Sequence, residues 1–370
     1  MTTSMLKAGI MLIGMFCTSH IIYSSFQNEA LLFQGSSRFL AKRGALELDE
    51  NPSGFIILGM HRSGTSMLSG LLVKGFGYNP GNDLMEATGD NEKGYFELMP
   101  VVEQNSVFLY DQLLHGNWSR GLLDGWNHSN VDSFNHEIAI QRALNGEIDV
   151  TNLRNATKQL NDPNIEPWLM KDPRMCITIR SWLPFLTSKP AVVFTYRNPL
   201  SVAMSLQKRD GMHLRNGLQL WLQYNKAAIQ NSNDLCRIFS NNDAILKDPF
   251  HEVNRISDEL HTKCGVPLPP RQITHDIVDD FIDPALQHGK KEVEVKDTPI
   301  KVIETYGDCQ IHEFGSLLSD DDLHKKFELD IYLKAMRVFC DLQSGAAYDS
   351  KYVWPLMNMP KEQESIVSIA

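Results

Sequence analysis

The stretch Gly54–Leu72, GFIILGMHRSGTSMLSGLL, decides the fold class of this chain. Its first part, Phe55–Leu58, is a continuous apolar run between glycines, which is typical of a strand buried on both faces of a parallel sheet. The apolar residues after it recur at helical spacing, and Gly75 and Gly77 predict the end of that helix. A buried strand, a tight turn and a helix in this order indicate an α/β protein.

The turn between strand and helix, Gly59–Ser66, has the composition of a phosphate-binding loop. Glycines let the backbone approach an anion, and N–H groups at the start of the helix point toward it. Thr65 and Ser66 add hydroxyl donors, and Arg62 adds a fixed positive charge. Thr65 stands where the nucleoside triphosphatase loop needs a lysine, and this departure argues against a magnesium-dependent triphosphatase.

The unit of strand and helix recurs along the chain. Trp168–Met170, Ala191–Tyr196 and Ala244–Leu246 are short apolar runs, each followed by a helical pattern. This alternation predicts a parallel sheet with helices on both faces. Helical patterns over Leu214–Asn231 and Asp320–Leu342 predict a further long helix and extra C-terminal helices, while residues 111–165 are expected to be loops or weak helices.

The ends of these predicted strands carry more basic than acidic groups. Arg62, Lys171, Arg197 and Lys247 follow the four runs, with Asp172 and Asp248 beside two of the four. Ligands of open α/β sheets bind at the carboxyl edge, where these side chains would meet. The set predicts a diphosphate-type ligand held without a metal ion, and we expect no metal ligands.

Two of these segments, GMHRSGTSMLSGLL and YRNPLSVAMSL, resemble the cofactor-binding elements of the sulfotransferase superfamily, whose donor is 3′-phosphoadenosine 5′-phosphosulfate. The resemblance implies a P-loop-like α/β fold and is nearer to bacterial and Golgi-type carbohydrate and tyrosylprotein members than to the cytosolic branch. It implies that Arg197 and Ser205 bind the 3′-phosphate. It also implies that the 5′-phosphosulfate is bound by Arg62, Ser63, Gly64, Thr65 and Ser66.

Three shorter fragments extend the resemblance over about Gly54 to Leu286: Lys93–Glu97, Met170–Arg174 and Phe281–Leu286. They imply that Glu97 is the general base, with Lys171 and Arg62 stabilising charge on the leaving phosphate. His61 and Glu86 are alternative bases. Arg62 stands where the cytosolic branch has a lysine, and arginine can bind a phosphosulfate bidentately but cannot give up a proton.

The composition excludes a general nucleic-acid coat. The chain has 370 residues, with 35 Lys and Arg against 45 Asp and Glu, for a net charge of −10. An acidic surface repels nucleic acid, so any bound anion must meet a local basic site. We expect the chain to divide into a signal anchor or signal peptide at residues 1–25, a stem at 26–52, one enlarged α/β domain at 53–350 and a tail at 351–370.

The N-terminal segment predicts a secretory destination. Ala8–Tyr23 is apolar and follows Lys7. This pattern favours a signal anchor in the Golgi membrane with a luminal catalytic domain over a cleaved signal peptide and secretion. A buried core helix is a third interpretation. The three acceptor sequons for N-glycosylation begin at Asn117, Asn127 and Asn155. In that compartment some of the cysteines after Cys17 could pair, but the sequence does not say which.

A luminal sulfotransferase would use a hydroxyl acceptor, first a carbohydrate or glycoprotein, then a protein tyrosine or small metabolite. Two other functions stay open. One is a magnesium-dependent P-loop kinase or nucleotide phosphotransferase, and the other is a non-catalytic nucleotide-binding relative.

Overall fold

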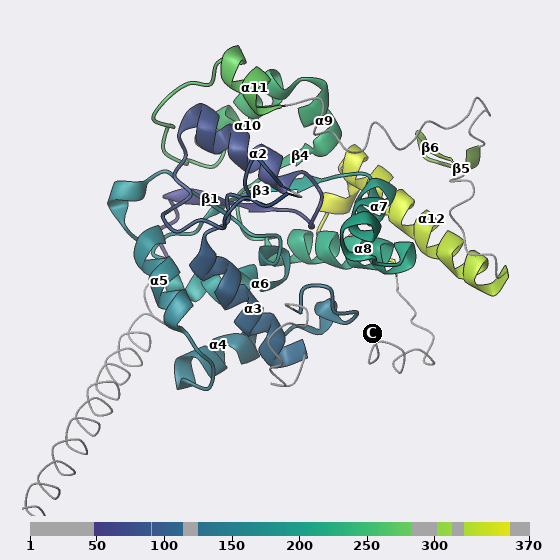
Figure 1. Cartoon of the computed structure of the whole chain (residues 1–370), viewed down its shortest axis with the longest axis horizontal. Helices are drawn as coiled ribbons and strands as arrows, with labels where there is room; N and C mark the ends of the chain where they lie inside the picture. Colours follow the sequence, from purple (N-terminus) through teal and green to yellow (C-terminus); the bar gives the residue numbers. More distant parts are fainter. Residues whose placement is uncertain (1–47, 90, 114–124, 283–301, 313–321, 356–370) are drawn as a thin grey trace, which may run out of the picture.

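A computed structural model of the chain describes residues 48–89, 91–113, 125–282, 302–312 and 322–355. Its centre is a sheet of four parallel strands in the order β2-β1-β3-β4. The strands are β1 (Gly54–Leu58), β2 (Trp168–Lys171), β3 (Ala191–Tyr196) and β4 (Arg237–Asn241). The parallel sheet flanked by helices confirms the predicted α/β class (Figure 1).

Helices cover both faces of this sheet because β1 and β3 are apolar on both faces. Successive side chains of a strand point to opposite sides, so Phe55 and Ile57 belong to one core and Ile56 and Leu58 to the other. The first core is covered by α2 (Thr65–Leu71), α9 (Asn242–Lys247), α10 (Pro249–Thr262) and α11 (His275–Phe281). The second is covered by α3 (Met99–Leu113), α4 (His136–Asn145), α5 (Thr151–Leu160), α6 (Met175–Trp182), α7 (Pro199–Asp210) and α8 (Leu214–Asn231).

The predicted strand Ala244–Leu246 is wrong, because these residues lie in α9. The strand precedes them as β4, an edge strand in which only Ile238 and Ser240 are buried. Asn241 then starts the helix: its side chain accepts a hydrogen bond from the Ala244 N–H at 2.7 Å. Lys247 and Asp248 consequently stand at a helix end, not at a strand end.

The region 111–165 is more helical than expected. It contains the end of α3 and the whole of α4 and α5. The Asn135 side chain accepts a bond from the Ile138 N–H at 3.1 Å and so caps α4, while Leu153 and Ala156 place one face of α5 in the core.

Two residues near the end of the predicted stem contact the α/β domain. Asp49 forms a parallel bridge with Ser188, and the Glu50 carboxylate pairs with Lys189 at 2.6 Å.

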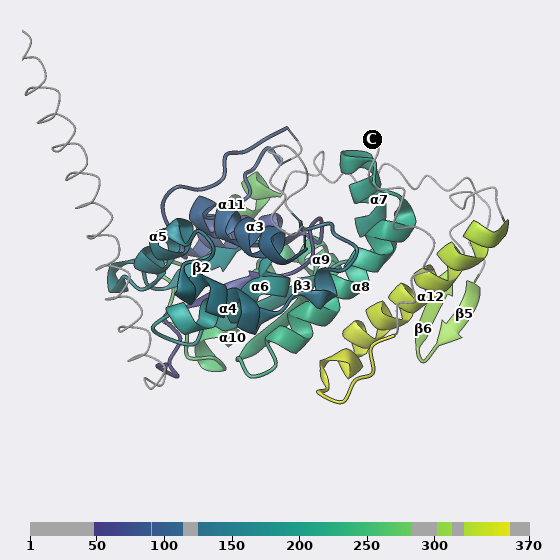
Figure 2. The same cartoon turned by 90° about the horizontal axis from the view of Figure 1, so that it is seen from below.

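The C-terminal part adds a helix and a hairpin to the sheet. Helix α12 (Asp322–Ser344) packs on α7 and α8, and β5 (Val302–Tyr306) pairs antiparallel with β6 (Cys309–His312) beside it (Figures 1 and 2). The sequence predicted the helix but not the hairpin.

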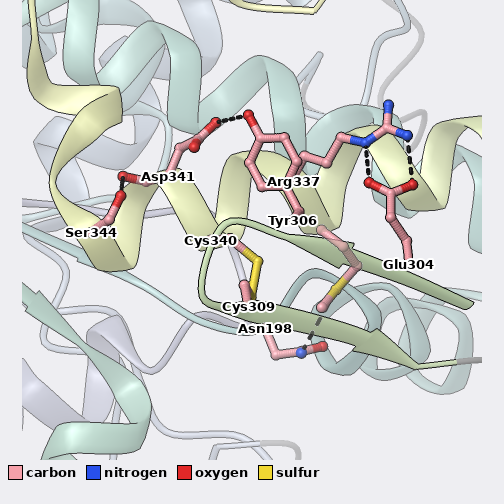
Figure 3. The surroundings of a disulfide bond; sticks show 9 residues. Asn198, Glu304, Tyr306, Cys309, Arg337, Cys340, Asp341 and Ser344 are labelled. Atoms are coloured by element: carbon pink, nitrogen blue, oxygen red, sulfur yellow. Dashed lines mark hydrogen bonds and ion pairs between the residues drawn. A yellow bond between two sulfur atoms is a disulfide. The ribbon is translucent and has the colours of Figure 1, made fainter. Parts of the chain in front are cut away.

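Three of the contacts that attach the hairpin to α12 are drawn in Figure 3. They are the Cys309–Cys340 disulfide, a two-pronged ion pair of Glu304 with Arg337 at 2.6 Å, and a Tyr306–Asp341 hydrogen bond at 3.3 Å.

A second disulfide joins Cys236 to Cys264, and Cys176 is a buried free thiol. Within the described ranges, no helix is both long and apolar enough to cross a membrane. The predicted N-terminal anchor, Asn117 and the tail from residue 356 onward lie outside these ranges.

Candidate functional site

The loop Gly59–Ser66 leaves the central strand β1 at the carboxyl edge of the sheet and leads into α2. Two glycines are required there by space and by backbone conformation. A Cβ on Gly59 would lie 2.5 Å from the Thr195 carbonyl oxygen. Gly64 has φ +85°, and a Cβ there would lie 2.1 Å from the Asn242 side-chain oxygen. The loop is thus fitted closely between the ends of β3 and β4.

Arg62 joins this loop to the second predicted element. Its Nε donates a hydrogen bond to Ser205 Oγ on α7 at 2.9 Å. The Arg197 guanidinium, directly after β3, donates through Nη1 to the Arg62 carbonyl oxygen at 3.3 Å. Three of the residues predicted to bind the phosphates therefore lie together, although 135 or more residues separate Arg62 from each partner.

This cluster contains two arginines, Arg62 and Arg197. Burial lowers the pKa of Arg197, nearby Asp243 opposes that shift, and Arg62 adds to it by like-charge repulsion. An arginine stays charged even so. The cluster is a local positive site on an acidic protein, as an anionic ligand needs.

Helix α7 holds Ser205 in place through its first turn. The Asn198 side chain caps the helix by accepting bonds from the Leu200 and Ser201 N–H groups, and Pro199 is its first residue, as predicted. The Trp221 indole of α8 donates to the Arg197 carbonyl oxygen at 2.9 Å. These bonds fix the turn between Arg197 and Ser205.

Lys171, at the end of β2, joins the loop to Glu97. Its Nζ donates to Ser66 Oγ at 3.1 Å and to Glu97 Oε1 at 2.5 Å. The side chains of Lys171 and Glu97 are only 1% and 7% exposed. Burial raises the pKa of Glu97, and the neighbouring Lys171 opposes this rise. The predicted catalytic cation and base therefore form one buried ion pair beside the loop.

A second buried pair stands behind the first and was missed by the sequence reasoning. Asp172 accepts from the Arg174 guanidinium at 3.0 Å and from the Asn105 amide at 2.8 Å. Asn105 also accepts from Thr178 at 2.6 Å. Arg174 lies in the Lys171-Asp172-Pro173-Arg174 segment and could have been noticed, but nothing in the sequence around Asn105 pointed to it.

The alternative bases are placed differently. His61 lies against the Trp126 ring, with ring centres 4.3 Å apart. Burial, with four nearby cations of which Arg174 is the strongest, lowers the pKa of His61 well below 6.5, so the imidazole is neutral at pH 7. Glu86 is exposed. Ser63 is fully buried within the loop, and Thr65 begins α2.

No protein-family model matches the chain, and a comparison with curated proteins finds no match. Sulfotransferases are among the solved structures that are similar to it. The sulfotransferase domain of the Synechococcus olefin synthase is 15% identical, with a TM-score of 0.37, over 64% of this chain and 80% of its own. The corresponding domain of the curacin biosynthetic pathway is 17% identical, with a TM-score of 0.35, over 59% and 76%.

Sulfotransferase STF1 from Mycobacterium tuberculosis is 12% identical, with a TM-score of 0.29, over 68% of this chain and 75% of its own. Within the described residues, no group of three or more His, Cys, Asp or Glu side chains is arranged to hold a metal ion. The contacts among Arg62, Arg197, Ser205, Lys171 and Glu97 are therefore what suggests a function.

Proposed function

We propose that this protein is a sulfotransferase that moves the sulfuryl group of 3′-phosphoadenosine 5′-phosphosulfate to a hydroxyl acceptor. The observation that carries the proposal is the contact of Arg62 with both Ser205 and Arg197. It joins a phosphate-type loop to a second set of anion-binding groups, as a ligand with two separate phosphate positions requires. A ligand with one phosphate chain needs only the first set.

In the proposed reaction the acceptor oxygen bonds to sulfur while the bond from sulfur to the 5′-phosphate oxygen breaks. The products are a sulfate ester and adenosine 3′,5′-bisphosphate, and the acceptor proton passes to Glu97. Lys171 and Arg62 stabilise the negative charge that grows on the leaving phosphate. Lys171 bonds Oε1 of Glu97, so that Oε2 can take the proton.

The binding of adenosine 3′,5′-bisphosphate, measured by titration calorimetry, tests this function. Arg197→Ala removes a cation from the predicted 3′-phosphate position, so the affinity is expected to fall about 10- to 100-fold. Ser205→Ala removes a neutral donor and should weaken binding about 3- to 10-fold. Both variants should bind adenosine 5′-phosphate about as well as the wild type.

Two variants at residues outside the contacts of the site serve as controls. Arg180 pairs with Asp234 at 2.7 Å, and Ser106 bonds within its own helix. Arg180→Ala and Ser106→Ala should leave the affinity unchanged. If Arg197→Ala and Ser205→Ala also leave it unchanged, the assignment is wrong. Magnesium-dependent turnover of ATP would instead favour the kinase. Tight nucleotide binding without transfer to any acceptor would favour the non-catalytic relative.

The proposed acceptor is a carbohydrate or glycoprotein, and the proposed location is a luminal one. Two disulfides, Cys236–Cys264 and Cys309–Cys340, support an oxidising compartment, where glycans are abundant acceptors. The proposed tether to the membrane is residues 1–25. Transfer of labelled sulfate to a panel of glycans, tyrosine peptides and phenols tests the acceptor class, and transfer to phenols alone would contradict the proposal.

A further inference from the structure

The last residue of α11, Phe281, lies between two parts of the candidate site. Its ring packs on Gly70 of α2 so closely that a Cβ on Gly70 would lie 2.0 Å from the Phe281 ring. On another side it contacts the ring of Phe96, with ring centres 6.1 Å apart and planes inclined by 52°. Phe96 directly precedes Glu97, the proposed base.

The face of α2 that Phe281 contacts is also linked to Glu97 through a second set of contacts. Ser66 and Gly70 are four residues apart on α2, so they lie on the same side of the helix. Ser66 accepts a hydrogen bond from Lys171, and Lys171 donates to Glu97. These contacts close a circuit, here named the Phe281 circuit, that consists of Ser66, Gly70, Phe281, Phe96, Glu97 and Lys171.

The backbone at Phe96 needs such support. Phe96 has φ +57°, a left-handed conformation that costs a non-glycine residue about 1 kcal/mol or more. Such a conformation persists only where its surroundings hold it. The Met85 N–H donates to the Glu97 carbonyl oxygen at 2.8 Å, and Lys93 Nζ donates to the Asp280 carbonyl oxygen of α11 at 3.0 Å. The segment before Glu97 is thus attached to α11 at both Lys93 and Phe96.

We infer that Phe281 is a positioning residue that fixes the Glu97 carboxylate relative to the phosphate-binding loop. The inference rests on the proposed function, because it takes Glu97 as the base. Phe281 does not touch the reacting atoms. It holds Phe96 in its left-handed conformation against α2, so that Glu97 and Ser66 approach Lys171 from fixed directions.

Two measurements on Phe281→Ala test the inference. Amide hydrogen exchange over residues 85–99 should become at least several-fold faster, because the support of Phe96 is lost. The kcat should fall about 10-fold or more, because a misplaced base transfers the proton poorly. The dissociation constant of adenosine 3′,5′-bisphosphate should stay within 2-fold. Phe281→Leu keeps an apolar side chain at this position and adds no atom at the ring tip that faces Gly70, so it should restore most of both exchange and kcat.

A control variant acts at the other end of the same helix. The Phe250 ring of α10 stacks on His275, the first residue of α11, with centres 3.8 Å apart. Phe250→Ala removes an aromatic contact of α11 without touching the Phe281 circuit. It should leave kcat and the exchange of residues 85–99 within 2-fold of the wild type.

A double-mutant cycle tests the contact itself. Gly70→Ala places a methyl group where the Phe281 ring lies, so alone it should lower kcat about as much as Phe281→Ala. In the Phe281→Ala background the ring is gone, and the same methyl group should lower kcat no further. Additive losses in the double variant would show that Gly70 and Phe281 act separately and would overturn the circuit.

The outcomes separate this inference from the proposed function. Unchanged exchange, or faster exchange with unchanged kcat, would overturn the role of Phe281 while leaving the sulfotransferase intact. A loss of kcat together with weaker bisphosphate binding would assign Phe281 to the phosphate site and overturn the inference as well. A wild type that does not bind the bisphosphate would overturn the proposed function, and the exchange of Phe281→Ala would still test the contact.

Discussion

Arg62 combines two roles that are usually divided between residues. Its side chain donates to Ser205, and its main-chain carbonyl accepts from Arg197, so one residue orders both halves of the proposed phosphate site. It does so with φ +67°, a conformation in which a side chain other than glycine is strained. Glycine at this position would relieve the strain but would remove the guanidinium. The strain is therefore located where the charge is needed.

At the same scale, the pH dependence of activity should identify Glu97 as the base. The base must be deprotonated, so kcat/KM rises with pH through its pKa, and burial raises that pKa above 4.5. In Lys171→Met the cation that opposes this rise is absent, so the acid limb should move to higher pH as kcat falls. A pH–rate profile from pH 4 to 8 measures both.

Glu97→Gln supplies the control for this assignment. Glutamine keeps the shape of the side chain but cannot take a proton at this pH, so kcat should fall about 100-fold or more and the acid limb should vanish. Near wild-type transfer by Glu97→Gln would remove Glu97 from the mechanism. A limb that moves to lower pH in Lys171→Met would contradict the proposed effect of Lys171.

At the scale of elements, the loop depends on where β4 ends. Asn242, the first residue of α9, packs against Gly64, and an alanine at position 64 would meet both an unfavourable φ and this side chain. Gly211, which ends α7, has φ +67° with open space around it. Both glycines thus have a positive φ, but only Gly64 lies against another side chain, that of Asn242.

Gly64→Ala should therefore destabilise the protein more than Gly211→Ala does. Gly211→Ala should lower the free energy of unfolding by about 1 kcal/mol, from backbone strain alone. Gly64→Ala should lower it by about 1–3 kcal/mol more, because the methyl group displaces Asn242. Urea unfolding followed by circular dichroism compares the two. Equal losses would show that the loop and α9 do not depend on each other.

The strands and helices that carry a sequence motif could be predicted from the sequence, but the segments that pack against them could not. The strands β1, β2 and β3 are continuous apolar runs because both faces are buried, and the cap at Asn198 has its own local signal. β4 was misplaced because only two of its five residues are buried and the run Ala244–Leu246 that follows it is more apolar.

The residues that support the site were missed for a similar reason. Asn105 acts through tertiary contacts with segments far along the chain, and no local pattern specifies such contacts. Phe281 begins a fragment that carries the resemblance, but nothing local indicated its contact with Phe96. In contrast, Arg62, Arg197 and Ser205 were recognised because their own segments carry the resemblance.

At the scale of the molecule, two kinds of feature support the proposed secretory route. Four of the six cysteines pair within the described residues, and Asn155 of the third sequon is exposed on α5. Asn127 is half-buried beside the buried Trp126. A glycan needs open space around its asparagine, so the fold is compatible with modification at Asn155 and less so at Asn127.

Protein expressed in a eukaryotic secretory host should therefore carry an N-glycan at Asn155. Treatment with a peptide N-glycosidase should increase the mobility of the wild type and of Thr157→Ser, which keeps the sequon. Part of that shift should be absent in Asn155→Gln and Thr157→Ala. If all four proteins shift equally, Asn155 does not carry the glycan.

The strand order has a consequence for the synthesis of the protein. The central strand β1 is made first, but it pairs with β2 and β3, which begin at Trp168 and Ala191. A nascent chain that ends before Ala191 therefore contains the phosphate loop without either Arg197 or Ser205, and its β1 lacks a partner on one side. Such non-local pairing is slow to form. The apolar strand β1 must avoid contact with other chains on the ribosome until more than half of the protein has been made. Premature termination of translation should therefore yield aggregates instead of a smaller active domain.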